Sequence, residues 1–513
     1  MKKLLKKSLI LSCILHLASC ILFSYPPGWS DDILLTPETS GYRNEPDVSV
    51  DSYNNVWVIW DSVFWGDGYI YYTKRDSLGN CIISETALSD PMHSCGGHAK
   101  VVLDNSDNIH IQWTEPSPTG NGIGYAKLDN DGSIIVNPNL AMPGYGGGES
   151  CNRHEIALDK YKNINVVWDE QPLETNQISY TKLDSLGDTL IARIRISPTG
   201  IYSIWPGIGV DSFANNHMAY RTGGGASDSL TYSKLDKDGN ILISNKILGT
   251  GGIPVMISDQ SQNIHMIYAD PAGPGISIEY LKLDQEANIL VGPITLSINE
   301  YNNYPHMAMD SLQYLHVVWD TESGGAFPIM YAKLDTLGNF VIPPMQVVYP
   351  PYTPGGGMAR IAVDRSNKLH LVWVDGRLNP GVSTDIFYKR GENENTVEEM
   401  SRLKTANLPG ITVFPNPFSE VAKISFGNVH PDRITHSSYG TGSAEGMELK
   451  IFDASGRLVR SFPIINLCNP NKSVVSVYWA GTDDIGNHLP AGVYFIRLSS
   501  AALTQSTRVI LLK

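Results

Sequence analysis

The stretch HMAMDSLQYLHVVWD (306–320), followed by YAKLDTLGN (331–339), decides the fold of this chain. Apolar and polar residues alternate on both sides of Asp310, as expected for two strands joined by a tight turn. The first phrase occurs seven times, with anchoring aspartates spaced 48 to 55 residues apart, and the second phrase follows the first six copies. The anchoring aspartates are Asp51, Asp104, Asp159, Asp211, Asp259, Asp310 and Asp364. Seven such copies indicate a repeat protein.

Each copy contains four short alternating segments joined by turns rich in aspartate. The second phrase often ends in Asp-x-x-Gly-Asn, a tight-turn sequence in which glycine supplies the positive φ that the turn needs. Four antiparallel strands in a unit of about 50 residues, repeated seven times, indicate a β-propeller. An open β-solenoid is the alternative, although its repeats are usually shorter.

The two ends of the repeat region predict how the ring closes. The seventh copy stops after its third strand, DIFYKR (385–390), and then becomes polar. The missing outer strand is found near the N-terminus, where DDILLTPETSGYRNEPDVSVD (31–51) aligns with GPITLSINEYNNYPHMAMD (292–310). A chain start that completes the last blade removes exposed sheet edges. We therefore expect an all-β chain with a seven-bladed propeller of four-stranded blades over residues 30–390.

The same register places one residue of each copy at one mouth of the central channel. The residues two and four positions before each anchoring aspartate share a face of the innermost strand, because side chains alternate along a strand. The nearer position holds mostly small residues, which suit the crowded axis, whereas the farther position is varied and often polar. The farther series, named here the mouth ring, is Asp47, Lys100, Glu155, Gly207, Val255, His306 and Arg360.

The loops that enter each first strand lie at this mouth, and their sequences differ between copies. They carry aromatic and polar residues, including Arg43, Arg153 and Trp205, and such a mixture suits a sugar or a peptide ligand. Arg377 lies in another loop at the same mouth and has no counterpart in the other copies. The candidate ligand-binding residues are therefore these four together with the five polar members of the mouth ring.

Structural roles compete with binding for several of these positions. Neighbouring copies carry opposite charges in the mouth ring, so ion pairs that close the channel are the alternative for Asp47, Lys100, Glu155 and Arg360. A histidine recurs at one position of five copies, and a catalytic residue is needed only once. We therefore assign a structural role to His110, His217, His265, His316 and His370.

The N-terminus has the pattern of a secretory signal peptide over residues 1–24. Lysines precede an apolar run from Leu9 to Phe23, and cleavage is expected near Ser24. Nothing else in the chain is long and apolar enough to span a bilayer, so no transmembrane anchor is expected after cleavage. The sequence LASC (17–20) also resembles a lipobox, and lipidation of Cys20 is the alternative.

The polar residues 391–410 are expected to form a linker, and residues 411–513 a small β-sandwich made of short alternating strands. Four motifs follow one another there: VFPNPF (413–418), IFDASGR (451–457), WAGTD (479–483) and GVYF (492–495), ahead of a terminal lysine. In this order they resemble the C-terminal sorting domain of the type IX secretion system. The residues that carry the resemblance are Pro415, Asn416, Pro417, Gly456, Trp479, Gly492 and Tyr494.

The resemblance implies an Ig-like sandwich that the type IX secretion machinery recognises. It also implies export to the outer-membrane surface, or into the medium, of a Gram-negative bacterium. Exported proteins can hold disulfides, and Cys95 and Cys151 precede the same strand in adjacent copies, so they are a candidate pair. The cysteines lack metal-ligand spacing, and neither a metal nor another cofactor is expected. The net charge of −14 argues against a nucleic-acid partner.

Three functions fit these observations. A non-enzymatic secreted or surface propeller that binds a glycan or a protein is favoured, because no unique nucleophile or acid–base motif appears outside the repeat. The second is a sialidase-like or other glycoside-active enzyme, in which Arg43, Arg153 and Arg360 converge on a carboxylate. It lacks the Ser-x-Asp-x-Gly-x-Thr-Trp box typical of that superfamily. The third is a structural component of the cell-surface layer.

Overall fold

The computed structural model divides the chain into two compact units, Met1–Asn393 and Glu394–Lys513. These residues contain no helix long and apolar enough to cross a membrane, wherever the structure describes them. The described residues are 28–36, 42–64, 67–88, 97–117, 120–144, 153–170, 175–223, 228–271, 275–297, 301–322, 327–348, 356–379, 383–392, 412–414, 419, 421–427, 448–453, 456–463, 474–484, 486–499 and 504–512.

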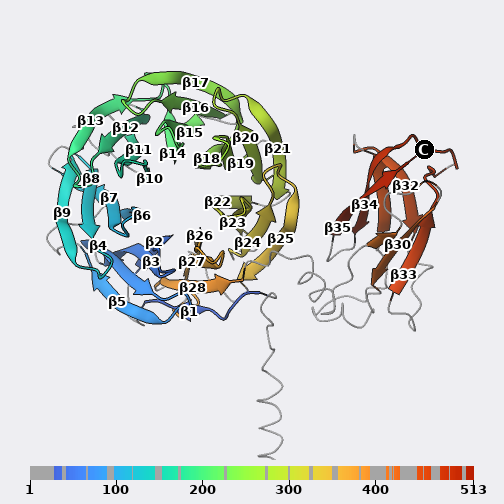
Figure 1. Ribbon diagram of the computed structural model, residues 1–513, viewed down its shortest axis with the longest axis horizontal. Helices are drawn as coiled ribbons and strands as arrows, with labels where there is room; N and C mark the ends of the chain where they lie inside the picture. The colour runs from blue at the N-terminus through green and yellow to red at the C-terminus, as the bar shows by residue number, and fades with distance from the viewer. Residues whose placement is uncertain are drawn as a thin grey trace, which may run out of the picture. The chain divides into compact units, whose positions relative to one another are not determined.

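The first unit is a ring of seven four-stranded antiparallel sheets (Figure 1), which confirms the predicted propeller. From the inner to the outer strand, the blades are β2 (Tyr42–Val50), β3 (Val56–Phe64), β4 (Asp67–Arg75) and β5 (Cys81–Ala87); β6 (Gly97–Leu103), β7 (Ile109–Glu115), β8 (Gly122–Leu128) and β9 (Ile134–Met142); β10 (His154–Leu158), β11 (Ile164–Glu170), β12 (Gln177–Leu183) and β13 (Thr189–Arg195); β14 (Ser203–Val210), β15 (Asn216–Thr222), β16 (Ser229–Leu235) and β17 (Ile241–Thr250); β18 (Gly252–Ser258), β19 (Ile264–Asp270), β20 (Ser277–Leu283) and β21 (Ile289–Ser297); β22 (Tyr301–Met309), β23 (Leu315–Glu322), β24 (Ile329–Leu334) and β25 (Phe340–Val348); and β26 (Gly357–Val363), β27 (Leu369–Asp375), β28 (Asp385–Gly391) and β1 (Ile33–Leu34). We number these blades 1 to 7 in that order.

The N-terminal strand closes the ring as the sequence predicted. Strand β1 is the outer strand of blade 7 and pairs antiparallel with β28, Ile33 opposite Tyr388 and Leu34 opposite Phe387. The inner strands contact one another all the way round, with β26 of blade 7 meeting β2 of blade 1. Closure therefore joins the two ends of the repeat region through backbone hydrogen bonds.

An aromatic residue recurs nine positions after each anchoring aspartate and fills the seams between blades. Trp60 of blade 1 belongs to a buried cluster with Val372 of blade 7, and Trp373 of blade 7 belongs to one with Val318 of blade 6. Trp60 and Trp373 are each at most 1% exposed. Burying such large apolar surfaces stabilises the contact between neighbouring sheets.

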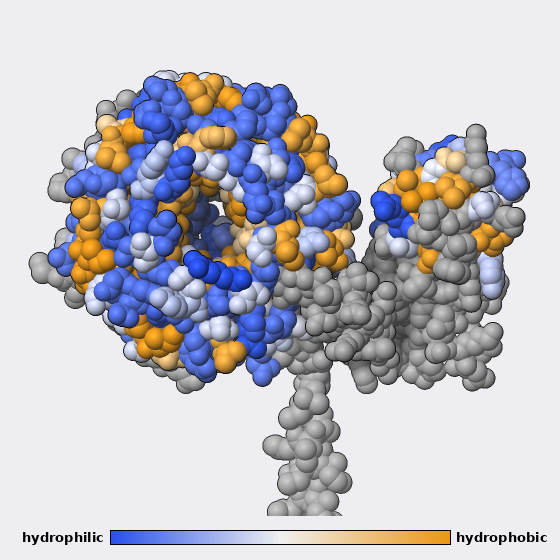
Figure 2. Space-filling model, in the orientation of Figure 1, coloured by the Kyte–Doolittle hydropathy of each residue, from blue (hydrophilic) through white to orange (hydrophobic). Residues whose placement is uncertain are grey.

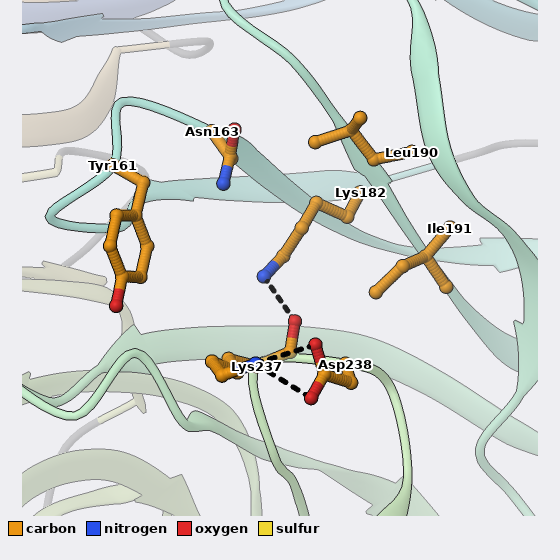
Figure 3. Close-up of a pocket in the computed structure, with 7 residues that line it drawn as sticks. All are labelled: Tyr161, Asn163, Lys182, Leu190, Ile191, Lys237 and Asp238. Carbon is orange, nitrogen blue, oxygen red and sulfur yellow. Dashed lines mark hydrogen bonds and ion pairs between the residues drawn. The ribbon is translucent and has the colours of Figure 1, made fainter.

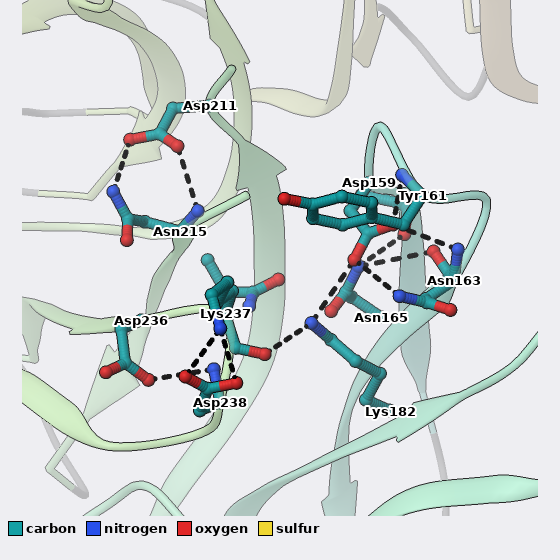
Figure 4. A network of polar contacts seen from close by, with 12 residues as sticks. Asp159, Tyr161, Asn163, Asn165, Lys182, Asp211, Asn215, Asp236, Lys237 and Asp238 are labelled. Carbon is teal, nitrogen blue, oxygen red and sulfur yellow. Dashed lines mark hydrogen bonds and ion pairs between the residues drawn. The ribbon is translucent and has the colours of Figure 1, made fainter. Parts of the chain in front are cut away.

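Each anchoring aspartate organises the turn that follows an inner strand. In blade 3, Asp159 Oδ1 accepts backbone hydrogen bonds from Tyr161 and Asn163 at 2.9 Å, and its Oδ2 lies 3.2 Å from Lys182 Nζ (Figure 4). Lys182 Nζ also donates to the carbonyl of Lys237 in blade 4 at 2.7 Å. Equivalent lysines donate to a turn of the next blade from Lys74, Lys127 and Lys234. These recurring lysines thus link neighbouring blades through hydrogen bonds.

The histidine column belongs to the same polar layer. In blade 6, His316 Nε2 lies 3.2 Å from Asp310 Oδ2, and Nδ1 lies 2.9 Å from the hydroxyl of Tyr331. The histidine side chain is fully buried. Because the contacts recur from blade to blade, the structural role assigned to these histidines from the sequence is confirmed.

The second unit is a sandwich of two sheets, with strand orders β29-β30-β33 and β32-β31-β34-β35. Its strands are β29 (Thr412–Phe414), β30 (Ala422–Gly427), β31 (Glu448–Asp453), β32 (Leu458–Pro463), β33 (Val474–Trp479), β34 (Gly492–Ser499) and β35 (Thr504–Leu511). Trp479 and Tyr494 pack edge to face in its core, 5.3 Å between ring centroids, and the Tyr494 hydroxyl donates to the Pro490 carbonyl at 2.7 Å. Gly456 has a φ of +81°, which the turn after β31 requires. Pro415, Asn416 and Pro417 lie outside the described residues.

Candidate functional site

A β-bulge in the inner strand shapes the channel mouth in most blades. The pairing of β2 with β3 shifts between Asn44 and Asp47, and the inner strands of blades 2, 4, 5, 6 and 7 shift at the corresponding place. In these six blades the residue two positions before the mouth ring has a positive φ, between 44° and 59°. We call this series, with its blade 3 member, the bulge ring: Glu45, His98, Arg153, Trp205, Ile253, Tyr304 and Met358.

The bulge ring is a repeated departure from ordinary strand geometry. Non-glycine residues pay of order 1–3 kcal/mol to occupy the left-handed region, and such positions cluster at functional sites. A bulge also bends its strand and changes the direction of a side chain. The propeller therefore presents two rings of side chains at one mouth, whereas the sequence predicted one.

Blades 1 and 2 fill their part of the mouth with paired charges. The Glu45 carboxylate contacts the imidazole of His98. Burial by itself would raise the pKa of Glu45, but the hydrogen bond and charge of His98 outweigh it and hold the pKa at about 2. Lys100 Nζ lies 2.6 Å from Glu155 of blade 3. Asp47 accepts a hydrogen bond from the backbone of Val101 at 2.9 Å.

These contacts agree with part of the ion-pair alternative. Lys100 and Glu155 are paired across adjacent blades as that alternative requires. Burial raises the pKa of Asp47, an effect that the charges of Lys100 and Arg360 oppose. The charges on the side of blades 1 to 3 therefore neutralise one another. The other charged and aromatic side chains of the mouth lie toward blades 3 to 7.

Arg153 contacts aromatic side chains on the side of the mouth formed by blades 3 to 7. Its guanidinium carbon lies 5.9 Å from the ring centroid of Trp205 and 5.4 Å from that of Tyr304, and Nη2 lies 3.5 Å from the Tyr304 hydroxyl. Since Tyr304 belongs to blade 6, Arg153 reaches from blade 3 across the opening. Arg221 of blade 4 also lies over Trp205, at 4.9 Å from its ring centroid. Aromatic faces attract cations in this arrangement.

A hollow opens beside Arg153 in the centre of the ring. Figure 2 shows one face of the propeller hollowed at its centre, with hydrophilic residues around the opening. The lining comes from blades 3 to 7 and combines both rings: Arg153, Glu155, Trp205, Pro206, Ile253, Pro254, Val255, Tyr304, Pro305, His306 and Arg360. Five predicted candidates thus meet in one place.

A second hollow continues from the first one over blades 4 and 5. It shares Trp205 and Ile253 with the first hollow, so these two residues form the ridge between them. Arg221 and Asn303 supply its polar side chains. We call the pair of hollows the mouth groove.

Buried carboxylates hold the bulges in place from behind. Asp169 accepts backbone hydrogen bonds from Arg153 at 3.0 Å and from Trp205 at 3.2 Å. Asp320 accepts them from Met358 at 2.5 Å and Ala359 at 3.4 Å. Burial raises the pKa of Asp169, and it raises that of Asp320 to about 7. These buried carboxylates thus fix the backbone of the bulge ring at Arg153, Trp205 and Met358.

Arg43 and Arg377, both predicted as binding candidates, are directed elsewhere. Arg43 Nη1 lies 3.6 Å from Asp385 of blade 7, and Nε lies 3.9 Å from Glu85 of an outer strand. Arg377 Nη1 lies 2.7 Å from Asp32, and its guanidinium also contacts Asp375. Neither residue lines the mouth groove, because each is paired with carboxylates elsewhere. The pair of Arg43 with Asp385 links blade 1 to blade 7, and that of Arg377 with Asp32 links blade 7 to the start of the chain.

Cys95 and Cys151 lie outside the described residues. Among the described cysteines, Cys81 is exposed and forms no disulfide. The described residues contain no cluster of histidine, cysteine and carboxylate side chains suited to a metal ion.

A shallow pocket on the opposite face shows a different chemistry. It lies between blades 3 and 4, beside the turns of Asp159 and Asp236, and Figure 3 shows Lys182 pointing to the carbonyl of Lys237. Lys237 is itself paired with Asp238 at 2.7 Å. The polar groups of this pocket therefore belong to the hydrogen-bonded contact that recurs between neighbouring blades.

Sequence reasoning missed Glu45, His98 and Arg221. A signal for the bulges was present, because a proline follows the bulge residue in four copies, at Pro46, Pro206, Pro254 and Pro305. Proline inside a sheet is confined to edges and bulges. For Arg221 there was no such signal, since it sits on a second strand and reaches Trp205 only in the folded ring.

The comparisons with known proteins support the architecture. The family model of the FlgD Ig-like domain matches residues 429–503, which confirms an Ig-like fold for the second unit. No curated protein matches the sequence.

Several solved structures resemble the fold. A protein of unknown function from Dyadobacter fermentans is 10% identical with a TM-score of 0.44, over 71% of this chain and 99% of that one. A fungal alcohol oxidase, solved with copper, is 11% identical with a TM-score of 0.47, over 94% and 99%. A neuraminidase-like protein of a bat influenza A virus is 10% identical with a TM-score of 0.39, over 72% and 98%. These similarities concern the fold alone.

Proposed function

We propose that this protein is a non-enzymatic binding protein of the bacterial surface or surroundings, and that its ligand occupies the mouth groove. The single observation that carries the proposal is the position of Arg153, which directly precedes β10 at the mouth and lies between the rings of Trp205 and Tyr304. A cation and two aromatic faces at the entrance of a concave surface are typical of a binding site.

The strain in the bulge ring supports the same proposal. A channel that only had to be closed would be filled by ordinary strand residues at no cost in backbone energy. Instead, six blades hold non-glycine residues at positive φ. Backbone strain is retained where the aim of a side chain matters.

Binding can be tested with the purified mature protein on glycan arrays and on peptide arrays, followed by calorimetry with any hit. Trp205→Ala should weaken binding at least tenfold, because Trp205 contributes to both hollows of the groove. Phe213→Ala is the matched control, since Phe213 is an exposed aromatic residue of the same blade, in the turn at the other end of its inner strand. Equal affinities of the two variants would refute a ligand at the mouth.

The sialidase-like alternative receives less support. It needs Arg43, Arg153 and Arg360 around one carboxylate, and Arg43 is engaged by Asp385 and Glu85. Release of free sugar from a bound glycoside would nevertheless favour an enzyme over a binding protein, so any ligand should be incubated with the protein and analysed for products.

We further propose export by the type IX secretion system, with residues 1–24 as signal peptide and residues 411–513 as sorting domain. The motifs of the second unit support this route, and Gly456, Trp479 and Tyr494 occupy structural positions in it. Deletion of residues 411–513 should trap the protein in the periplasm of its native host. Surface display of the truncated protein would contradict the proposal.

A further inference from the structure

We propose that the ligand of the mouth groove is an acidic saccharide, with its carboxylate between Arg153 and Arg360 and its next sugar over the ridge of Trp205 and Ile253. This inference rests on the proposed function and names the class of ligand. It follows from the charge, the shape and the backbone of the groove, taken in turn.

The charge of the first hollow favours an anion. Its ionisable lining residues include two arginines, Arg153 and Arg360. The carboxylate of Glu155 is already matched by Lys100 at 2.6 Å. Burial, together with the charges of Arg360 and Lys100, holds the pKa of His306 well below its usual range, so this imidazole is neutral. Guanidinium groups bind carboxylates through paired hydrogen bonds.

The charged groups that face these arginines from behind do not cancel the preference. Asp47 is near Arg360, but burial raises its pKa and its carboxylate accepts the backbone hydrogen bond of Val101. Asp169 is engaged by the backbone of Arg153 and Trp205. Both carboxylates therefore hold the backbone, and Glu45, whose charge also acts on Arg153, is paired with His98. Arg153 and Arg360 both line the hollow, and Arg360 Nη1 donates to the Ala359 carbonyl at 3.2 Å.

The shape of the groove suits more than one sugar unit. Trp205 and Ile253 are common to the two hollows, so a ligand anchored in the first would cross an aromatic ridge to enter the second. Gly252 lines the second hollow, and a side chain there would approach the Arg221 chain at 3.1 Å. The glycine thus leaves room for Arg221, whose guanidinium is paired with Asp228, to lie over Trp205.

The backbone argues against a peptide as the occupant. An extended peptide binds a free strand by adding to its ladder of hydrogen bonds. The inner strands are interrupted by bulges at the groove, and Pro206, Pro254 and Pro305 have no N–H group to donate. Recognition must therefore come from side chains, and arginines with aromatic rings recognise an acidic sugar in that way.

The test is calorimetry with three probes: a trisaccharide ending in glucuronic acid, its methyl ester and the neutral glucose counterpart. We expect the acid to bind at least tenfold more tightly than both others, with an affinity that falls as salt rises. Equal binding of the three would overturn the inference, as would a protein that binds only acidic peptides. Either result would leave the proposed function standing if Trp205→Ala still abolished binding.

Variants in blade 7 provide the matched control. Arg360→Gln should remove the preference for the acid, and Arg360→Lys should retain part of it, because the charge remains while the paired geometry is lost. Arg365→Gln makes the same charge change at an exposed turn at the other end of the inner strand of that blade and should bind as the original protein does. Thermal unfolding of each variant separates loss of binding from loss of the fold. A folded Arg360→Gln protein that still prefers the acid would refute the inference.

Discussion

Asp32 is expected to hold the propeller closed. It lies just before β1, where its Oδ1 is 2.8 Å from Lys389 Nζ and its Oδ2 is 2.7 Å from Arg377 Nη1. Lys389 is fully buried and also donates to the carbonyl of Val347 at 2.8 Å. Burial lowers the pKa of Lys389, and Asp32 opposes that effect. The substitution Asp32→Asn would therefore leave a buried ammonium group without its carboxylate.

The expected loss is about 3–5 kcal/mol, the usual cost of removing one partner of a buried ion pair. Unfolding entropy is about 2.1 cal/mol/K per residue, or roughly 0.75 kcal/mol/K for a propeller of about 360 residues. The melting temperature should therefore fall by about 4–7 °C. The deficit should shrink as pH rises toward the pKa of an ordinary lysine, because a neutral amine costs less to bury.

Differential scanning calorimetry of the full chain measures this shift. The matched control is Asp31→Asn, which makes the same charge change at the adjacent, exposed residue. We expect the control to melt within about 1 °C of the original protein, as surface charges usually contribute little. If the two variants melt at the same temperature, Asp32 does not hold the closure, and the reasoning is wrong.

Replacing His316 by Phe should cost about 1–3 kcal/mol in urea unfolding, because it removes the nitrogen that lies 2.9 Å from the Tyr331 hydroxyl. His316→Asn should cost less, since Asn165 fills this position in blade 3 and accepts from a tyrosine; equal losses would contradict this. Burial raises the pKa of Asp320 from 3.8 to about 7, so the folded protein holds this proton more tightly than the unfolded chain. The contribution to folding stability is therefore fully present below pH 4 and is lost as pH rises through 7. In Asp320→Asn, the unfolding free energy from thermal melts should change with pH by about 4 kcal/mol less than in the original protein. The same dependence of stability on pH in both proteins would contradict this prediction. Tyr494→Phe loses a hydrogen bond to a backbone carbonyl. It should lower the free energy of unfolding of the second unit alone, by about 1 kcal/mol, in thermal melts.

Most of the fold could be predicted because the information is local and repeated. Each copy carries its own alternation and its own anchoring aspartate, and the first six also carry a second turn, so seven independent stretches indicate the same kind of blade. The closing strand was recognisable for the same reason, since residues 31–51 align with the corresponding part of another copy. Sevenfold repetition turns weak local signals into a firm prediction.

The candidate site could be predicted only in part. Register placed Glu155, His306 and Arg360 at one mouth, and the structure brings them together. Register could not predict that Arg43 would be turned outward to Asp385, because an ion-pair partner in another blade is not visible in a local pattern. Register also could not predict the bulges, which in six blades place a second residue of the inner strand beside the first; only the prolines that follow four of the bulge residues indicate them.

By itself, the sequence determined the number of blades, the order of strands, the closure and the kinds of residue at the mouth, because these follow from periodicity within about 50 residues. Only the tertiary structure decided which charges are already paired, as Lys100 is with Glu155, and which residues meet across the ring, as Arg153 does with Tyr304. The physical reason is distance along the chain. Arg153 and Tyr304 are 151 positions apart, and their contact exists only once the blades between them have closed the circle.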